Sequence, residues 1–258
     1  MKTSPRYFAV LALTGVVGGL LSGAFGIGGG VIMVPLLVLL ARLDQRTAAA
    51  TSLVAIVPTS IVGAVTYIVQ GHIDFAAGGL VAVGAVAGAI VGTRLLRRIP
   101  LGWLRWMFIG FVVAVAVRML LVAPERGVSV ELTAWVALGY IALGLVMGVA
   151  SGLFGIGGGV IAVPALVAVF GASDLVAKGT SLLVMIPTGV VGTVASARAG
   201  VVDVRAGLVV GIAATIASVP GVALAVVMPP RLSGVLFAVL LFAAAAQLTV
   251  AAIRGRAS

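Results

Sequence analysis

The stretch SGAFGIGGGVIMVP, residues 22–35, returns as SGLFGIGGGVIAVP at residues 151–164, and twelve of the fourteen positions are identical. Both copies lie inside long apolar segments, where glycine weakens a helix. A proline closes each copy, Pro35 in the first and Pro164 in the second, and is expected to kink the helix that contains it. The repeated motif therefore predicts a helix break at two equivalent places in the chain.

The composition around these motifs is that of a membrane protein. Of the 258 residues, 62% are hydrophobic and only 9% are charged, with a mean hydropathy of +1.35. A soluble domain of this size needs far more charge on its surface. Apolar runs at 75–91, 130–149 and 232–253 are near or above the ~20 residues that cross a bilayer. We expect an all-α, polytopic membrane protein surrounded by the lipid bilayer.

Several functions are disfavoured by what the sequence lacks. The net charge of +10 comes from basic residues beside apolar runs, where they set membrane orientation, so no nucleic-acid partner is expected. The chain has no cysteine, and its single histidine, His72, cannot build a cluster of histidine metal ligands. No paired carboxylates or catalytic dyad stand out. We therefore expect no enzyme activity, no metal and no cofactor.

Aligning the chain with itself at an offset of 129 residues extends the repeat far beyond the glycines and needs no gap. Two structural copies are therefore predicted, at 1–125 and 126–258, which together form one transmembrane domain. The matched polar and proline positions include Thr51 with Thr180, Ser52 with Ser181, Pro58 with Pro187, and Asp74 with Asp203.

Each copy is expected to contain a glycine-broken helical hairpin followed by three transmembrane helices. As one helix at ~1.5 Å per residue, the 35 residues of 7–41 would reach about 52 Å, against a bilayer core of ~30 Å. The glycine clusters at 26–30 and 155–159 are therefore predicted to turn the chain back. The expected ranges are 7–41 (hairpin), 47–69, 75–97 and 103–123 in the first copy, and 131–171 (hairpin), 175–197, 203–228 and 232–253 in the second.

The distribution of lysine and arginine favours the hairpins and gives an orientation. If each hairpin enters and leaves on one face, twelve of the sixteen basic residues lie on the side of both chain termini, which is then the cytoplasm. The four assigned to the other side are Arg118, Arg126, Lys178 and Arg231. Loops at equivalent positions of the two copies carry opposite charge bias. This pattern predicts that the two copies are inverted relative to each other.

The glycine turns of two inverted hairpins can meet near the bilayer midplane. Each turn leaves backbone groups without helical partners, and a helix starts directly after it. The N–H groups and positive dipole end of a helix start suit an anion. The predicted anion site consists of Gly26, Gly28, Gly29, Gly30, Gly155, Gly157, Gly158 and Gly159.

Two other interpretations of the glycines are open. Close helix packing explains the scattered glycines of 84–92 well, but it explains three consecutive glycines followed by a proline less well. A nucleotide-binding loop is disfavoured, because no Lys-Ser/Thr pair follows the glycines.

Hydroxyl side chains near the turns extend the predicted site. Pro58 and Pro187 are expected to kink the helices that carry most of them, which can open those helices beside the hydroxyls. The hydroxyls could donate to an oxyanion or, alternatively, bond carbonyls of their own helices. These residues are Thr51, Ser52, Thr180 and Ser181 and, just before the turns, Ser22 and Ser151.

Acidic residues give no proton path. Asp44, Asp74, Asp174 and Asp203 lie at predicted helix ends, and Asp74 and Asp203 are expected to cap the helices that follow. Without a buried acid, the sequence does not identify a proton carrier.

The duplicated GxFGIGGGxxxVP, with TSL and a proline one helix later, resembles the sulfite exporter TauE/SafE family, also called 4-toluene sulfonate uptake permeases. The resemblance covers nearly the whole chain, and its motif carries over at residues 26–35 and 155–164. It implies a bacterial inner-membrane transporter of small sulfur-containing or organic anions, such as sulfite, sulfoacetate and sulfonates. No residue here distinguishes among these substrates.

The expected function is therefore secondary transport of a small anion by alternating access of the two halves. The alternatives are an anion channel with the same turns lining a pore, and a structural membrane subunit without transport. The sequence leaves the substrate, the direction, the coupling ion and the oligomeric state open.

Overall fold

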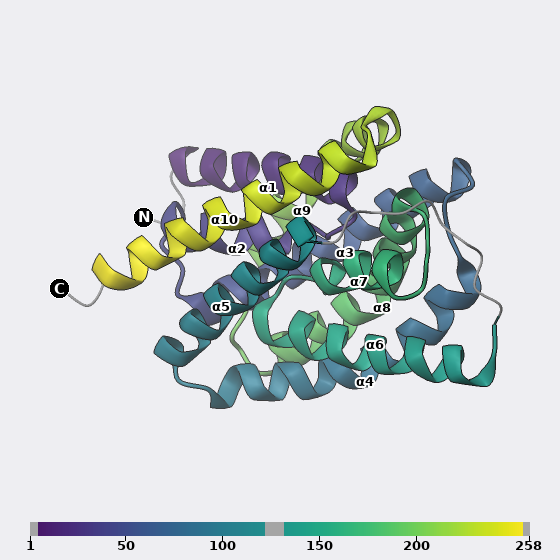
Figure 1. The fold of residues 1–258 in the computed structure, drawn as a ribbon. Helices are drawn as coiled ribbons and strands as arrows, with labels where there is room; N and C mark the ends of the chain where they lie inside the picture. Colours follow the sequence, from purple (N-terminus) through teal and green to yellow (C-terminus); the bar gives the residue numbers. More distant parts are fainter. Residues whose placement is uncertain (1–4, 122–131, 255–258) are drawn as a thin grey trace.

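The structure, a computed structural model, describes residues 5–121 and 132–254. Within these ranges the chain is helical and contains no strand, which confirms the predicted all-α fold (Figure 1). Seven of the described helices are long and apolar enough to cross a membrane. The helices are α1 (Pro5–Phe25), α2 (Gly30–Leu39), α3 (Gln45–Val69), α4 (Phe75–Arg98), α5 (Leu101–Leu121), α6 (Ala134–Phe154), α7 (Gly159–Ala168), α8 (Asp174–Arg198), α9 (Val204–Val227) and α10 (Pro230–Arg254).

Both glycine clusters break an apolar segment, as predicted. Four residues separate α1 from α2, and four separate α6 from α7. The short helix α2 runs back along α1, because Leu37 near its end packs in one apolar cluster with Leu11 of α1. In the second hairpin, Gly158 at the start of α7 lies against Met147 in the middle of α6. Each cluster therefore forms a hairpin of one long and one short helix.

Small residues bring two pairs of helices into close backbone contact. Gly84 of α4 lies against Ile141 of α6, and Gly92 lies against Val149, so these two helices run in the same direction. A methyl group on either glycine would overlap with a carbonyl of α6. Three glycines of α1 pack on α9 in the same way. Figure 1 shows α4 and α6 side by side along one edge of the molecule.

The helices α3 and α8 cross at the centre. Gly63 of α3 lies against Leu182 of α8, whereas Leu53 of α3 lies against Gly192. Residue numbers fall along α8 as they rise along α3. These two helices, which occupy equivalent places in the predicted copies, therefore run in opposite directions.

Two aspartates fix the starts of the helices that follow. Asp74 accepts a hydrogen bond from the N–H of Ala77 at 2.9 Å, and Asp203 accepts one from Ala206 at 3.0 Å. The predicted capping role of both carboxylates is confirmed.

Candidate functional site

The two glycine turns lie against each other at the centre of the fold. A methyl group added at Gly30 would lie 2.6 Å from Cα of Ile156, and one added at Gly159 would lie 2.7 Å from Cα of Ile27. Residues 26–30 thus run beside residues 155–159 in the opposite direction. The structure therefore brings the eight predicted site glycines together from the two ends of the sequence.

The conformation of these turns explains the consecutive glycines. Gly28 and Gly29 have φ of 71° and 73°, and Gly157 and Gly158 have φ of 74° and 88°. Backbone with positive φ is strained for residues with a side chain and accessible to glycine. The two turns repeat the same backbone geometry, so the duplicated sequence is folded twice in the same local shape.

The backbone N–H groups of the turns are unpaired. Within the described part of the chain, no acceptor is found for the amides of residues 27–31 or 156–160. These residues are buried, and orphaned buried N–H groups are rare in proteins because each loses its hydrogen bonds to water. Successive unpaired amides at a helix start form a concave donor surface that suits an anion. The turns therefore offer two sets of five donors.

Serine hydroxyls of the two central helices hold the turns in place. Each hydroxyl lies within hydrogen-bond distance of a carbonyl of its own helix, Ser52 Oγ at 2.8 Å from that of Ala49 and Ser181 Oγ at 2.8 Å from that of Lys178. Ser52 Oγ also contacts the carbonyl oxygen of Gly155 at 2.6 Å, and Ser181 Oγ contacts that of Gly26. Each of the latter two contacts joins the two halves of the chain. A serine hydroxyl has one proton to donate, so in this conformation these two side chains serve the protein backbone. Their role as anion donors stays a prediction.

The neighbouring threonines make another kind of contact between the halves. Thr51 Oγ1 accepts the N–H of Asp203 at 3.1 Å, and Thr180 Oγ1 accepts the N–H of Asp74 at 3.0 Å. Each hydrogen bond therefore connects a central helix, α3 or α8, to the start of a helix from the other half, α9 or α4. Neither contact uses the threonine proton.

Ser22 and Ser151 differ from the other predicted hydroxyls. Both side chains are fully buried, and within the described residues neither hydroxyl has a hydrogen-bond partner. They stand four residues before Gly26 and Gly155, on the last turns of α1 and α6. A buried unpaired hydroxyl needs an explanation, and a bound ligand or water is the usual one.

Apolar side chains pack on the glycine turns, a feature that the sequence interpretation missed. Met185 Sδ would lie 2.5 Å from a methyl group at Gly28 and 2.9 Å from one at Gly157, and Ile56 contacts both glycines as well. Ile56 and Met185 are fully buried and stand exactly 129 residues apart, at equivalent places in the repeat. The site is therefore closed in this conformation. The repeat alignment pairs these two residues, but an apolar side chain does not by itself indicate a binding site.

The four predicted kink prolines all lie inside helices and outside the glycine turns. Pro35 lines an apolar cavity of about 270 Å³ between α1, α2 and α10, and Pro164 lines one of about 330 Å³ between α5 and α7. No turn glycine lines either cavity. Pro58 and Pro187 lie inside α3 and α8.

Two comparisons with known proteins bear on this site. A model of the family described as sulfite exporter TauE/SafE matches residues 2–119 and 140–258. The chain is 26% identical over 219 residues to "Probable membrane transporter protein YunE" of Bacillus subtilis, covering 76% of this chain and 80% of that protein. It is 30% identical over 188 residues to "Probable membrane transporter protein YdhB" of the same organism, covering 72% of this chain and 77% of that protein.

Proposed function

The chain belongs to the sulfite exporter TauE/SafE family of membrane transporters, and from this premise we propose that it is a secondary carrier of a small anion. The substrate class is a sulfur-containing oxyanion or an organosulfonate, such as sulfite or sulfoacetate. The paired glycine turns bind it through their backbone N–H groups. The observation that carries this proposal is the set of unpaired, buried amides at residues 27–31 and 156–160.

Alternating access of two inverted halves is the proposed mechanism. The opposite directions of α3 and α8 support the inversion, because equivalent helices of inverted copies must run in opposite directions through the bilayer. The packing of α1 on α9 and of α6 on α4 supports two equivalent halves, since α1 corresponds to α6 and α9 corresponds to α4 in the repeat. In this arrangement both chain termini are cytoplasmic and the protein lies in the bacterial inner membrane.

The covered site supports a carrier rather than an open channel. A carrier passes through a state in which its site is closed to both sides, and here the turns are buried with Ile56 and Met185 packed on Gly28 and Gly157. For transport, these side chains must move away from the glycines on one side at a time.

Flux through liposomes tests the proposal. Purified protein is expected to exchange labelled sulfite, thiosulfate or sulfoacetate with saturation and counterflow, and empty liposomes serve as the control. Ohmic single-channel currents would instead identify a channel. Proteoliposomes that move none of the three anions would contradict the transport proposal itself.

Removing the two unpaired hydroxyls is expected to change stability and affinity in opposite directions. In the empty protein, Ser22→Ala with Ser151→Ala eliminates two buried groups that each cost roughly 1–3 kcal/mol when unpaired, so the Tm should stay the same or rise. Anion affinity should fall by about tenfold, because two donors are lost. Thermal unfolding with and without anion measures both effects.

The matched control is Ser218→Ala. Ser218 is also fully buried, but its hydroxyl donates to the carbonyl of Thr215 at 2.8 Å. Its replacement should give no gain in Tm and no change in affinity. A double variant that is less stable than the wild type and binds anion equally well would refute the role of Ser22 and Ser151.

A further inference from the structure

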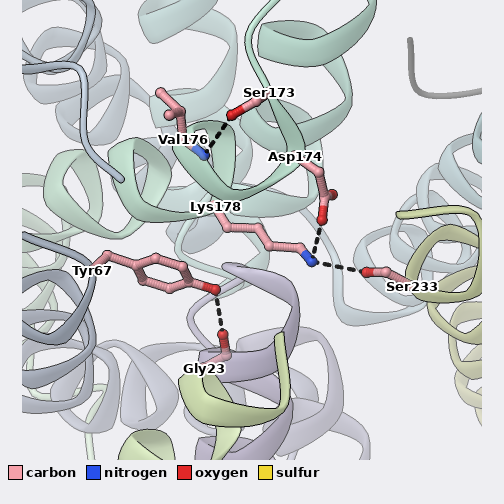
Figure 2. A network of polar contacts seen from close by, with 7 residues as sticks. All are labelled: Gly23, Tyr67, Ser173, Asp174, Val176, Lys178 and Ser233. Atoms are coloured by element: carbon pink, nitrogen blue, oxygen red, sulfur yellow. Dashed lines mark hydrogen bonds and ion pairs between the residues drawn. The ribbon is translucent and has the colours of Figure 1, made fainter. Parts of the chain in front are cut away.

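A lysine is buried beside the first glycine turn. Lys178, which the sequence analysis assigned to the membrane side opposite the chain termini, lies in the first turns of α8 with only 1% of its surface exposed. Its Nζ lies 2.6 Å from Oδ2 of Asp174 and donates to Oγ of Ser233 on α10 at 2.9 Å (Figure 2). Charged residues inside membrane segments are rare and mostly functional, because the bilayer core penalises them strongly.

The lysine backbone packs directly on the turn. A methyl group at Gly26 would lie 2.5 Å from Cα of Lys178 and 2.6 Å from its Cβ. One turn further along α8, Ser181 holds the carbonyl of Gly26. Figure 2 shows Tyr67 beside this group, with its hydroxyl donating to the carbonyl of Gly23 at 2.9 Å. The backbone of Lys178 thus packs on the first glycine turn, which is part of the proposed anion site.

The fold itself does not require this lysine. At the equivalent place in the other half, Ala49 packs on Gly155 with the same geometry, since a methyl group at Gly155 would lie 2.5 Å from Cα of Ala49. Gln45 takes the place of Asp174 there, and Leu104 takes the place of Ser233. The same contact between helix and turn therefore forms without any charge. One half alone carries the ion pair, which points to a role other than packing.

We propose that the Lys178 ammonium binds the negatively charged group of the substrate, and that the Asp174 carboxylate pairs with this ammonium while no substrate is bound. The inference rests on the proposed function, which it deepens by naming the cation of the site. A carboxylate and a sulfur oxyanion are both anionic hydrogen-bond acceptors, so one can replace the other on an ammonium group. Ser233 retains its own hydroxyl proton, which it can donate to the incoming anion.

The exposure of the two partners fits this exchange. The Asp174 side chain is 14% exposed, whereas that of Lys178 is 1% exposed. The carboxylate can therefore turn outward into water when an anion takes its place, while the ammonium stays inside. A substrate that arrives at this end of α8 meets Asp174 first and Lys178 behind it.

Opposite effects of the two charges on affinity test this proposal. The probe is whichever of sulfite, thiosulfate and sulfoacetate the wild-type protein carries, titrated calorimetrically in slightly acidic buffer so that the lysine stays protonated. Asp174→Asn removes the competing carboxylate and should raise affinity by roughly tenfold, whereas Lys178→Ala should lower it by roughly tenfold to hundredfold. Lys178→Arg keeps the charge and should retain binding.

The double variant D174Q with K178A is the matched control for folding. It gives α8 the side chains that Gln45 and Ala49 supply at the equivalent place of α3, so it should fold with a Tm close to that of the wild type. Its anion affinity should be as low as that of Lys178→Ala alone. A merely structural ion pair predicts instead that Asp174→Asn and Lys178→Ala both lower the Tm and change affinity in the same direction or not at all.

The outcomes separate the two proposals. A wild-type protein that transports none of the three anions contradicts the transport proposal, and the inference about Lys178 is then refuted as well. A wild-type protein that transports, together with a folded D174Q/K178A variant that binds the probe as tightly as the wild type, overturns the inference about Lys178 alone.

Discussion

Replacing Gly30 by alanine is expected to reduce anion transport by roughly tenfold to hundredfold. Alanine favours a helix more than glycine does, so the start of α2 itself should not suffer. The added methyl group would instead lie 2.6 Å from Cα of Ile156 and overlap with the carbonyl of Gly155. Overpacking of this kind costs about 1–3 kcal/mol. Since the obstacle is backbone, no rotamer change relieves it, and the two turns must separate.

Gly79→Ala is the control for this variant. Gly79 also lies in a helix, α4, but nothing stands within 4 Å of a methyl group at this position. Both variants are reconstituted at equal protein density, and initial rates of labelled anion uptake are compared. A Gly30→Ala protein that transports at the rate of Gly79→Ala would show that contact between the turns is not needed for transport.

Shortening Met185 to alanine is expected to destabilise the protein and to open the site. Met185 is fully buried and covers Gly28, Gly157 and Gly159, so its removal leaves a cavity at the centre. Losses of this kind cost about 2–5 kcal/mol. The same cavity exposes the amides, so anion exchange per folded molecule should become faster. A fall in Tm with a rise in specific rate is the expected result.

Met107→Ala provides the comparison. Met107 lies on α5 and is 39% exposed, which makes it a methionine of the protein surface rather than of the covered site. Its truncation should change neither the Tm nor the rate by much. If Met185→Ala exchanged anion no faster than Met107→Ala, Met185 would not be a barrier to the site.

The glycine hairpins could be predicted from sequence, whereas the partners of the helices could not. The break at residues 26–30 follows from the length of the apolar segment and from three consecutive glycines. The pairing of α1 with α9 depends on glycines of one helix meeting backbone of another far along the chain. Many apolar faces offer small residues in this protein, so the pattern alone does not select the partner.

The candidate functional site likewise combines residues that could be predicted from the sequence with contacts that could not. The glycines were predicted from their residue type, because glycine has no side chain and readily adopts backbone conformations with positive φ. Ser52 and Ser181 were singled out as hydroxyls, and each bonds a carbonyl of its own helix, which was one of the two expectations. Their second carbonyl comes from the other half of the chain, which the sequence does not show. Lys178 was assigned to the membrane side opposite the chain termini from the hairpin topology, which says nothing about burial. Its burial depends on packing against α10 and the first turn, which the sequence does not show.

An amide NMR experiment on three glycines tests the central claim that the turns bind an anion through their N–H groups. The dipeptide Ile-Gly occurs three times, at Gly28, Gly110 and Gly157. Labelling isoleucine with carbonyl ¹³C and glycine with ¹⁵N therefore gives a spectrum of three peaks, and Gly110 on α5 is a built-in control with open space around it. Titration with a transported sulfur oxyanion should shift the proton signals of Gly28 and Gly157 downfield in a saturable way while that of Gly110 stays in place. Saturable binding of the anion without movement of the Gly28 and Gly157 peaks would contradict the account.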